Sequence, residues 1–496
     1  NSVTDNGAGG LSSSIGEMAS ETNGAKVFLD QVPLKYSGLL PWQIFISESQ
    51  ERMTLSVPKE NWSLLKAFAD SRNVQASVVG EFTDSGILQI LYGQEEVGSL
   101  SLSFLHDGLP KMNLKAKWTG PRARTSWKKA PARRLPLPSA SAILEKLVTD
   151  PSLASKEKWI RQYDHEVQGA TVVKPFESGK SSAPNDGAVI WMGAHGNEGF
   201  SGAVISSGIC PDYALIDPAI MAKLAVDEAV RNALVTGANP DKIALIDNFC
   251  WPDPLPGPKN LDAEQKLSEL VRTCRALAEI VLEYEMPLIS GKDSMKNDFI
   301  GTTSDGREVK ISVLPTLLVT ALAYHPDVRQ ALKPHAKPGS VLYVLGRPAT
   351  TEYFGATLPK YFEIECSSEF RFDLKQTRAF YQRFYEATRA QLISSAHDLS
   401  EGGLLFALFE SLLLHEGGVS LAMEDNELAY LFGEDPGRIL VSIEANQVEA
   451  FEAHFDPSER KCLGTVDETR AIRLLRKDGV EELALEPIAH LWRNQV

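Results

Sequence analysis

The stretch Leu288–Lys296 brings together side chains that could bind a phosphorylated ligand. A short apolar run ends at Gly291, and Lys292, Asp293 and Ser294 follow it directly. We expect a buried strand to hold the backbone here, while the glycine allows close approach of a ligand. The polar residues that follow would supply charge and a hydroxyl group to a cleft. This order of residue types is typical of a site for a nucleotide phosphate.

Oxygen-bearing side chains of the kind that bind Mg²⁺ occur at four further positions. Asp186 stands before an apolar run, and Asp398 follows one. Glu228 and Asn232 lie four residues apart, so they share one face of a predicted helix. Carboxylate and amide oxygens suit a magnesium ion. Each residue alone also reads as a helix cap, a surface charge or a turn former, and their joint arrival at strand ends and on one helix favours a metal site.

Two glycine clusters precede predicted helices, at Asp5-Asn-Gly-Ala-Gly-Gly-Leu11 and Asp398-Leu-Ser-Glu-Gly-Gly-Leu404. Free N–H groups at a helix start can bind an anion, although a tight turn explains the glycines equally well. The sequence contains no Walker A motif, no dinucleotide-binding glycine motif that opens a βαβ unit, and no H-E-x-x-H motif. His397 is expected to point to the opposite side of its strand from Asp398.

The composition bounds the class of protein. The chain has 496 residues, of which 43% are hydrophobic and 23% charged, as in a globular protein of about three domains. Its net charge of −15 argues against a general nucleic-acid binder. The 5 cysteines are scattered without metal-ligand spacing, which favours a reducing cytoplasm. We expect neither a signal peptide nor a membrane span, because no apolar run is long enough.

Alternating apolar runs and amphipathic stretches predict an α/β chain with mixed sheets. The predicted strands cover 53–57, 75–79, 87–91, 187–191, 242–246, 314–323, 340–345 and 393–398. The predicted helices cover 61–69, 217–237, 263–285, 373–391 and 404–415. The stretch 120–138 is rich in proline, lysine and arginine, and it is expected to be a linker.

An internal repeat emerges when the two glycine clusters are superposed. Glu17 and Glu410 then fall at the same offset, and Glu48-Ser-Gln-Glu-Arg52 matches Glu434-Asp-Pro-Gly-Arg438. Residues 1 to about 115 therefore form one copy of a unit that recurs near 393–490. Strands and a helix precede Asp398 in the second copy, and none precede Asp5, so we expect a chain that begins inside a domain.

Together these motifs resemble one enzyme family. They are Ile289-Ser-Gly-Lys-Asp-Ser-Met295, Ala396-His-Asp-Leu-Ser-Glu-Gly-Gly-Leu404, Asp5–Leu11 with Glu48–Arg52, and Trp159-Ile-Arg-Gln-Tyr-Asp-His165. The set is similar to phosphoribosylformylglycinamidine synthase, and the resemblance covers nearly the whole chain. It implies a tandem pair of units like aminoimidazole ribonucleotide synthetase, arranged as a pseudodimer.

The resemblance also implies domain limits and an activity. The limits are 1–118 for the C-terminal α/β domain of the first unit, 119–155 for a linker, 156–313 for the dimerisation-type domain of the second unit, and 314–496 for its C-terminal α/β domain. The implied activity converts formylglycinamide ribonucleotide (FGAR) to its amidine (FGAM), with ATP, Mg²⁺ and ammonia, through an iminophosphate. This is a ligase reaction of purine biosynthesis in the cytoplasm.

The resemblance assigns roles to individual residues. Asp5 matches a magnesium ligand of the catalytic site, and Asp186, Glu228, Asn232 and Asp398 match magnesium ligands of a second nucleotide site. The substrate positions are Glu48, Ser49, Gln50 and Ser294, and the nucleotide positions are Asp247, Gly291, Lys292 and Ser400. Lys292 replaces an asparagine ligand of small family members, which argues against a metal there. Leu288–Lys296 would face Asp5 and Glu48–Gln50 across the two units.

The resemblance leaves parts of the enzyme outside the chain. The catalytic histidines are expected upstream of Asn1, and ammonia is expected from a glutaminase subunit or domain, with a small accessory subunit as a further partner. Two other functions stay open: a non-catalytic scaffold that binds ADP and magnesium, and a related kinase or synthetase of the same fold.

Overall fold

The computed structural model describes residues 2–122, 138–163, 165–166, 168–179, 181–196, 198–347, 357–362, 372–423 and 427–495. The chain divides into two compact units, Asn1–Asn113 and Leu114–Val496. The basic stretch predicted to be a linker falls largely on 123–137, outside the described residues. Within the described residues, no helix combines the length and apolar composition needed to cross a bilayer.

The first unit consists of short strands and helices around one small core. Its elements are β1 (Ser2–Asp5), α1 (Leu11–Thr22), β2 (Ala25–Phe28), α2 (Pro41–Phe45), β3 (Met53–Ser56), α3 (Trp62–Ser71), β4 (Gly80–Phe82), β5 (Ile87–Tyr92), β6 (Glu95–Ser101) and α4 (Leu102–Asp107). The strands form a β1-β3 pair and a sheet of order β4-β2-β5-β6. Leu11, Ile15 and Ala19 on α1 pack against Val27 and Leu88 of this sheet. The predicted strand 75–79 is wrong: residues 75–79 form no strand, and β4, which pairs with β2, begins at Gly80.

The second unit contains a six-stranded sheet of order β13-β12-β16-β11-β10-β7. The strands are β7 (Thr171–Val173), β10 (Gly187–Trp191), β11 (Gly202–Ile209), β12 (Ile243–Cys250), β13 (Leu288–Ser294) and β16 (Thr316–His325). Helices α7 (Pro218–Val235) and α8 (Ala263–Tyr284) pack together, and α7 lies against the sheet. The sheet runs past position 313, because β16 returns between β11 and β12. The predicted domain limits otherwise stay predictions.

Helix α7 follows from its sequence. Asp217 caps it by accepting a hydrogen bond from the Ala219 N–H, and Pro218 occupies its first turn. The small alanine side chains allow the helix to lie close to the sheet. Gly208 of β11 faces the helix and has no Cβ atom that would clash with its backbone. A Cβ atom on Gly208 would stand 2.1 Å from the Ala225 carbonyl oxygen. The close contact explains why nearly all of α7 is buried.

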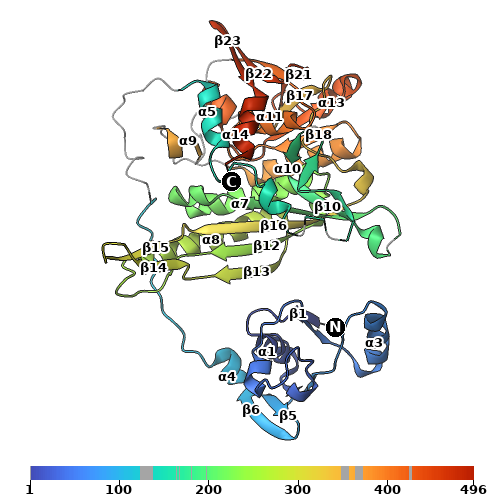
Figure 1. The fold of residues 1–496 in the computed structure, drawn as a ribbon, viewed down its shortest axis with the longest axis vertical. Coiled ribbons are helices and arrows are strands. Elements are labelled where there is room, and N and C mark those ends of the chain that lie inside the picture. Colours follow the sequence, from blue (N-terminus) through green and yellow to red (C-terminus); the bar gives the residue numbers. More distant parts are fainter. Residues whose placement is uncertain are drawn as a thin grey trace. The chain divides into compact units, whose positions relative to one another are not determined.

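The remaining part of the second unit carries two smaller sheets, of order β18-β20-β17-β21 and β19-β22-β23. Its elements are β17 (Val341–Leu345), α9 (Thr357–Tyr361), α10 (Leu374–Arg389), β18 (Ser395–Asp398), α11 (Gly403–Leu413), β19 (Val419–Ala422), α12 (Glu427–Phe432), β20 (Ile439–Ile443), α13 (Val448–His454), β21 (Arg460–Thr465), β22 (Ala471–Arg476), β23 (Gly479–Ala484) and α14 (Leu485–Arg493). Helices α5 (Ala140–Val148) and α6 (Glu157–Ile160) precede the large sheet in sequence, and α5 packs on α14. Figure 1 shows α7 between the large sheet and these elements.

The internal repeat is confirmed by the order and pairing of the elements. The series β1-α1-β2-α2-β3-α3-β4-β5-β6-α4 recurs as β18-α11-β19-α12-β20-α13-β21-β22-β23-α14. In both copies the first and third strands pair antiparallel, with Asp5 opposite Met53 and Asp398 opposite Ile439. These pairs occupy matching positions of the sequence repeat. The fold is therefore a mixed α/β fold with a duplicated domain.

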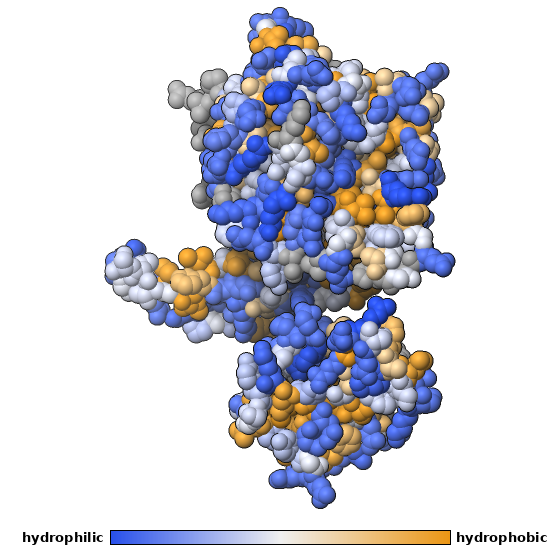
Figure 2. Space-filling view, turned by 45° about the vertical axis from the view of Figure 1, so that its right-hand side comes forward, coloured by the Kyte–Doolittle hydropathy of each residue, from blue (hydrophilic) through white to orange (hydrophobic). Residues whose placement is uncertain are grey.

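A projecting hairpin extends the second unit. Strands β14 (Asp298–Thr302) and β15 (Glu308–Ser312) pair antiparallel, and β8 (Phe176–Ser178) with β9 (Ser182–Pro184) forms a second small hairpin. Phe299, Ile300 and Ile311 are 62%, 60% and 62% exposed on the projecting hairpin. Figure 2 shows this apolar patch as orange atoms on the arm.

A buried ion pair joins the large sheet's helix layer to the second α/β copy. Asp227 and Arg231 on α7 form an i,i+4 pair whose side chains are 0% and 4% exposed. Asp227 also accepts hydrogen bonds from the Tyr284 and Tyr381 hydroxyls, at 2.9 and 2.6 Å, and from the Gly437 N–H at 3.1 Å. The carboxylate is thereby fully paired, which a buried charge requires.

We expect Asp227→Asn to lower the free energy of unfolding of the second unit by about 3–5 kcal/mol, because Arg231 would stay charged and buried without its partner. Guanidinium unfolding followed by tryptophan fluorescence measures the change. Asp478→Asn, an exposed carboxylate in the turn between β22 and β23, is the control and should be neutral. If Asp227→Asn lowers the free energy of unfolding by less than about 1 kcal/mol, the ion pair does not stabilise the contact between these elements.

Candidate functional site

The second unit brings two predicted metal ligands, Asp186 and Asp398, into one buried cluster with His397. Asp186 directly precedes β10, and His397 and Asp398 end β18. The His397 Nδ1 atom lies 2.6 Å from Asp186 Oδ1 and 3.8 Å from Asp398 Oδ1. All three side chains offer a ligand atom within 4.8 Å of the others. The cluster therefore has the spacing of ligands around one cation.

Helix α7 supplies the other two predicted metal ligands. Glu228 Oε2 accepts hydrogen bonds from the Ile209 N–H, at 2.8 Å, and from the Cys210 thiol. Asn232 Nδ2 donates to the Ser207 carbonyl oxygen at 2.9 Å, which turns its Oδ1 away from the sheet. The link to Asp398 runs through Arg231, whose guanidinium lies 3.4 Å from Asp398 Oδ2.

Two oxygens of this group are buried without a donor. Asp186 Oδ2 and Asn232 Oδ1 have no hydrogen-bond partner among the described residues. A buried acceptor without a partner is unfavourable by about 1–3 kcal/mol. Both atoms are hard oxygens, which Mg²⁺ prefers over nitrogen or sulfur. The chemistry of these donors fits a magnesium ion, and the ligand atoms grouped within 4.8 Å of one another are those of Asp186, His397 and Asp398.

Burial and mutual repulsion raise the affinity of these carboxylates for protons. Burial raises the pKa of Asp186 to about 7, against the opposing effect of His397. Burial, assisted by the charge of Asp398, likewise raises the pKa of Glu228 to about 7. Burial and the carboxylates of Glu228 and Glu434 raise the pKa of Glu401 well above its usual range. Several buried carboxylates close together, with raised pKa values, are typical of a functional site such as a cation-binding site.

His397 corrects one expectation. It was predicted to point away from Asp398, but it bonds to Asp186 beside Asp398, and its Nε2 lies 3.2 Å from Glu410 Oε2. The strand ends at Asp398, so the alternation of side chains no longer separates the two residues. The carboxylates of Asp186 and Glu410 raise the pKa of His397 well above its usual value, despite its burial.

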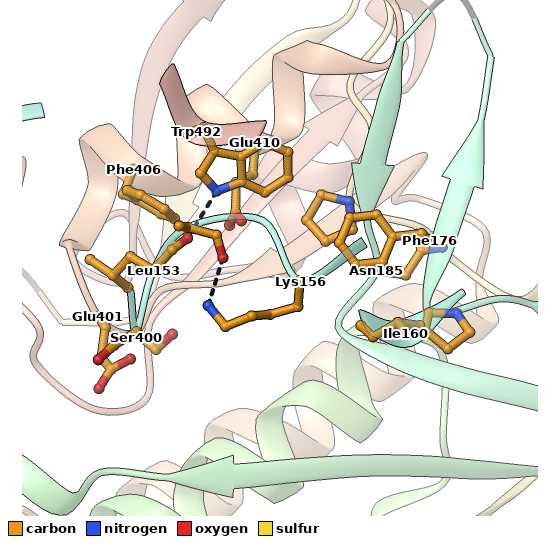
Figure 3. A pocket seen from close by; sticks show the side chains of 14 residues that line it. Leu153, Lys156, Ile160, Phe176, Asn185, Ser400, Glu401, Phe406, Glu410 and Trp492 are labelled. Carbon is orange, nitrogen blue, oxygen red and sulfur yellow. Dashed lines mark hydrogen bonds between the residues drawn. The ribbon is translucent and has the colours of Figure 1, made fainter. Parts of the chain in front are cut away.

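A cavity of about 310 Å³ opens beside this cluster, at Ser400. Figure 3 shows Ser400 and Glu401 at one end and Ile160, Phe176 and Asn185 at the other. Its walls are formed by Ser152, Leu153, Ala154, Lys156, Ile160, Pro175, Phe176, Pro184, Asn185, Ser400, Glu401, Phe406, Glu410 and Trp492. Flat aromatic walls with a few polar groups are typical of a pocket for a ring-bearing ligand.

Lys156 is the cation that lines this cavity, and no motif in the sequence predicts its role. Its Nζ atom donates to the carbonyl oxygens of Pro151 and Ala154, both at 2.6 Å. Burial lowers the pKa of Lys156, and the charges of Asp150, Glu401 and Glu410 oppose this effect. An ammonium group has three N–H bonds, so one remains for a ligand.

Residues Leu288–Ser294, which the sequence predicts to be a buried strand beside a ligand, form strand β13 at the edge of the large sheet. Every residue of β13 is exposed, so the expectation of a buried strand is wrong. The physical reason is the strand order, which leaves β13 with β12 as its sole neighbour among the described strands. An edge strand keeps one side open to solvent or a ligand.

Strand pairing places the predicted ligand-binding residues of β12 and β13 together. Asp247 lies opposite Gly291, and a Cβ atom on Gly291 would stand 2.6 Å from Asp247 Oδ1. A glycine is therefore needed to make room for the carboxylate. Burial, assisted by Asp293, raises the pKa of Asp247. By strand alternation, Lys292 and Ser294 lie on the opposite face of the sheet from Gly291.

The first unit holds its predicted site residues on two adjoining loops. Asp5 Oδ1 accepts a hydrogen bond from the Gly7 N–H at 2.7 Å, and Glu48 Oε1 accepts one from the Gly9 N–H at 2.9 Å. Ser49 Oγ lies 3.0 Å from Ser47 Oγ, and the Gln50 side chain donates to the Glu48 carbonyl oxygen. Asp5, Glu48, Ser49 and Gln50 are all exposed. Asp5 and Glu48 thus meet at the glycine loop.

Comparison with family models identifies the domains. The C-terminal domain of AIR synthase related proteins matches residues 1–93 and 337–476, and the N-terminal domain matches 185–314. The twofold match of the C-terminal domain agrees with the duplicated elements described above. The fold and the acidic cluster therefore define a protein built from AIR synthase related domains.

Known proteins narrow this class. The PurL subunit of phosphoribosylformylglycinamidine synthase from Streptomyces avermitilis is 33% identical over 89% of this chain and 56% of its own length. The PurL subunit from Anaeromyxobacter dehalogenans is 30% identical over the whole chain and 63% of its own length. The chain belongs to the AIR synthase related proteins, and its homologues over most of its length are PurL subunits of phosphoribosylformylglycinamidine synthase.

Solved structures agree with this fold. "Structure of PurLQS from Thermotoga maritima" matches with a TM-score of 0.58 at 22% identity, over 94% of this chain and 63% of that one. "T. maritima PurL complexed with FGAR" matches with a TM-score of 0.57 at 22% identity over 94% of this chain and 61% of that one. The chain thus spans less than two thirds of the length of the relatives it matches.

We expect Glu228→Gln to stabilise the metal-free second unit at pH 8 by about 3 kcal/mol. The pKa of Glu228 rises from its ordinary 4.5 to about 7 on folding, so its contribution to stability is full below pH 4.5 and is lost as the pH rises through 7. The gain should therefore vanish near pH 4.5. Guanidinium unfolding in a chelator at pH 4.5, 6, 7 and 8 measures it.

Glu486→Gln, an exposed change on α14, is the matched control and should show no such pH dependence. Saturating Mg²⁺ should cancel the advantage of Glu228→Gln, because glutamine is the poorer ligand. An equal effect at all pH values would contradict the raised pKa.

Proposed function

We propose that this chain is part of a phosphoribosylformylglycinamidine synthase. The reaction transfers a phosphoryl group from ATP to the formamide oxygen of FGAR, and ammonia then displaces phosphate to leave the amidine, FGAM. The observation that carries the proposal is the alignment of nearly the whole chain with PurL subunits. The solved relative in complex with FGAR supports the choice of substrate.

In the first unit, the proposed role of Asp5 is to bind the catalytic Mg²⁺, and that of Glu48, Ser49 and Gln50 is to bind FGAR. The exposure of all four side chains supports these roles. A bound Mg²⁺ would supply charge neutralisation for the transferred phosphoryl group.

On the large sheet, the proposed nucleotide-binding residues are Asp247, Gly291 and Lys292, and Ser294 is a proposed substrate contact. The exposure of β13 at the edge of the sheet, and the Asp247 carboxylate that lies against Gly291, support ligand binding at this edge. Lys292 would neutralise a phosphate as a point charge. The prediction that this strand shares one site with Asp5 and Glu48–Gln50 stays a prediction.

The second nucleotide site is proposed from residues of the second unit alone. Asp186, Glu228, Asn232 and Asp398 would bind Mg²⁺, and Ser400 would contact the nucleotide phosphates. The buried oxygens without a donor support the metal, and the adjoining cavity has room for a nucleoside. Solved relatives in complex with ATP and with ADP support a nucleotide as the ligand.

The proposed partners are a glutaminase subunit or domain that supplies ammonia, and a small accessory subunit. One solved relative from Thermotoga maritima is named PurLQS, and this name supports an assembly of several subunits.

We expect Asp5→Ala to reduce ammonia-dependent FGAM formation by the full-length gene product by about 100-fold or more, because several kcal/mol of charge stabilisation would be lost. A coupled assay for ADP release with FGAR and ammonium measures the rate. Glu21→Ala, an exposed carboxylate on α1, should retain activity. Wild-type activity in Asp5→Ala would contradict the proposed role of Asp5 as a ligand of the catalytic Mg²⁺.

We expect ADP with Mg²⁺ to stabilise the second unit, by about 2.7 kcal/mol at a ligand concentration 100-fold above Kd. The double variant Asp186→Asn with Asp398→Asn should lose this effect, and Asp478→Asn should keep it. Differential scanning calorimetry measures the shift. Absence of a shift at millimolar ADP would contradict the second site.

The second candidate function is a non-catalytic nucleotide-binding scaffold, because all residues proposed for the second nucleotide site lie in the second unit. The same assays test it. A nucleotide-binding scaffold would show the ADP shift, while the full-length gene product would form no FGAM. A related kinase would release ADP without FGAR.

A further inference from the structure

The two copies of the repeat share a contact that their sequence motifs do not reveal. Glu48 Oε1 accepts a hydrogen bond from the Gly9 N–H at 2.9 Å, and Glu434 Oε1 accepts one from the Gly402 N–H at 3.0 Å. Glu48 and Glu434 occupy the same place in the repeat, as do Gly9 and Gly402. We name this contact between glutamate and glycine loop the glutamate clasp.

The backbone around the clasp is also the same in both copies. Gly9 and Gly402 have φ angles of 80° and 82°, and the glycines that follow them have φ angles of 58° and 65°. A Cβ atom on Gly10 would lie 2.0 Å from the Ser47 carbonyl oxygen, and one on Gly403 would lie 2.9 Å from the Gly433 carbonyl oxygen. In each copy, the glycine loop thus packs against the residue just before the glutamate.

The loop conformation needs this support. Non-helical backbone with two consecutive positive φ angles is costly even for glycine, since it restricts a flexible chain. In the first copy the loop carries Asp5 at one end and the start of α1 at the other. A hydrogen bond from Gly9 to a residue 39 positions away fixes the loop between them.

The copies differ at the second oxygen of the glutamate. Glu434 is 5% exposed, and its Oε2 accepts a hydrogen bond from the Tyr213 hydroxyl at 2.8 Å. Glu48 is exposed, and within the described residues of the first unit its Oε2 has no hydrogen-bond partner. The first copy thus leaves free the acceptor that a hydroxyl fills in the second.

We propose that Glu48 has two separable roles: Oε1 positions the glycine loop beside Asp5, and Oε2 accepts a hydrogen bond from an O–H or N–H group of the substrate. The substrate donor would take the place that the Tyr213 hydroxyl holds in the second copy. Glu48 is therefore a positioning residue as well as a substrate contact, and Glu434 is a positioning residue alone. This inference rests on the proposed function of the first unit, and it deepens that function.

Two variants separate the roles. In Glu48→Gln the amide oxygen can still accept from Gly9, while the amide nitrogen stands in place of Oε2 and can no longer accept from the substrate. Glu48→Ala removes both acceptors. Glu21→Ala is the matched control, because it removes an exposed carboxylate of α1 away from the clasp.

The positioning role is tested by hydrogen exchange on the full-length protein without ligands, read by mass spectrometry. Glu48→Ala should speed exchange in the peptide 5–11 roughly fivefold, the effect of losing one hydrogen bond, and Glu48→Gln should stay within about twofold of the wild type. Glu434→Ala should affect 398–404 and leave 5–11 unchanged. Unchanged exchange in Glu48→Ala, or equal exchange in Glu48→Gln and Glu48→Ala, would overturn the positioning role.

The substrate role is tested by steady-state kinetics of FGAM formation. Glu48→Gln should raise KM for FGAR about tenfold with kcat little changed, because one hydrogen bond to a charged acceptor is lost. Glu48→Ala should also lower kcat, because the loop beside Asp5 loosens. An unchanged KM in Glu48→Gln would overturn the role of Oε2. If the wild-type protein forms no FGAM, the proposed function fails, and the exchange experiment still decides the clasp.

Discussion

The buried pair of Asp227 and Arg231 is the constraint on which the second unit depends. Asp227 satisfies its oxygens with Arg231, two tyrosine hydroxyls and the Gly437 N–H, which come from α7, α8, α10 and the loop before β20. Arg231 then reaches Asp398 at the end of β18. A charge buried this deeply must keep all its partners, so these elements cannot shift independently. The acidic cluster around Asp186 and Asp398 inherits this rigidity, as a metal site requires.

The duplication shows how one local architecture can serve two environments. Both copies keep the register of the first and third strands, the two positive φ angles of the glycine loop and the glutamate that holds it. What differs is what surrounds them: Glu48 is exposed in the first copy, whereas Glu434 is covered by Tyr213 from outside the repeat. The loop is thus exposed in the first copy, whereas in the second copy it forms part of a contact between domains.

Local patterns predicted what depends on local geometry. The spacing of Glu228 and Asn232 was sufficient to place them on one helix, because four residues complete about one turn. The repeat was visible because it preserves Asp5 and Asp398 with their glycines. The burial of β13 was misjudged, since its edge position depends on strand order and not on its own residues. The roles of Lys156 and Glu410 depend on the cavity that they line together, which joins segments far apart in the sequence. The turn of His397 toward Asp186 likewise depends on a residue 211 positions away.

The contacts of Glu434 with Tyr213 and of Gly437 with Asp227 restrict how the sequence of the second copy can change. Glu434 and Gly437 stand where the first copy has the segment Glu48–Arg52, and in the second copy this segment fastens one domain to another through Asp227 and Tyr213. Any mutation that restored an open loop there would leave a charged carboxylate or a phenol buried without a partner. A sequence change that opens this segment must therefore also remove the buried groups that it now satisfies, or the folded protein becomes less stable.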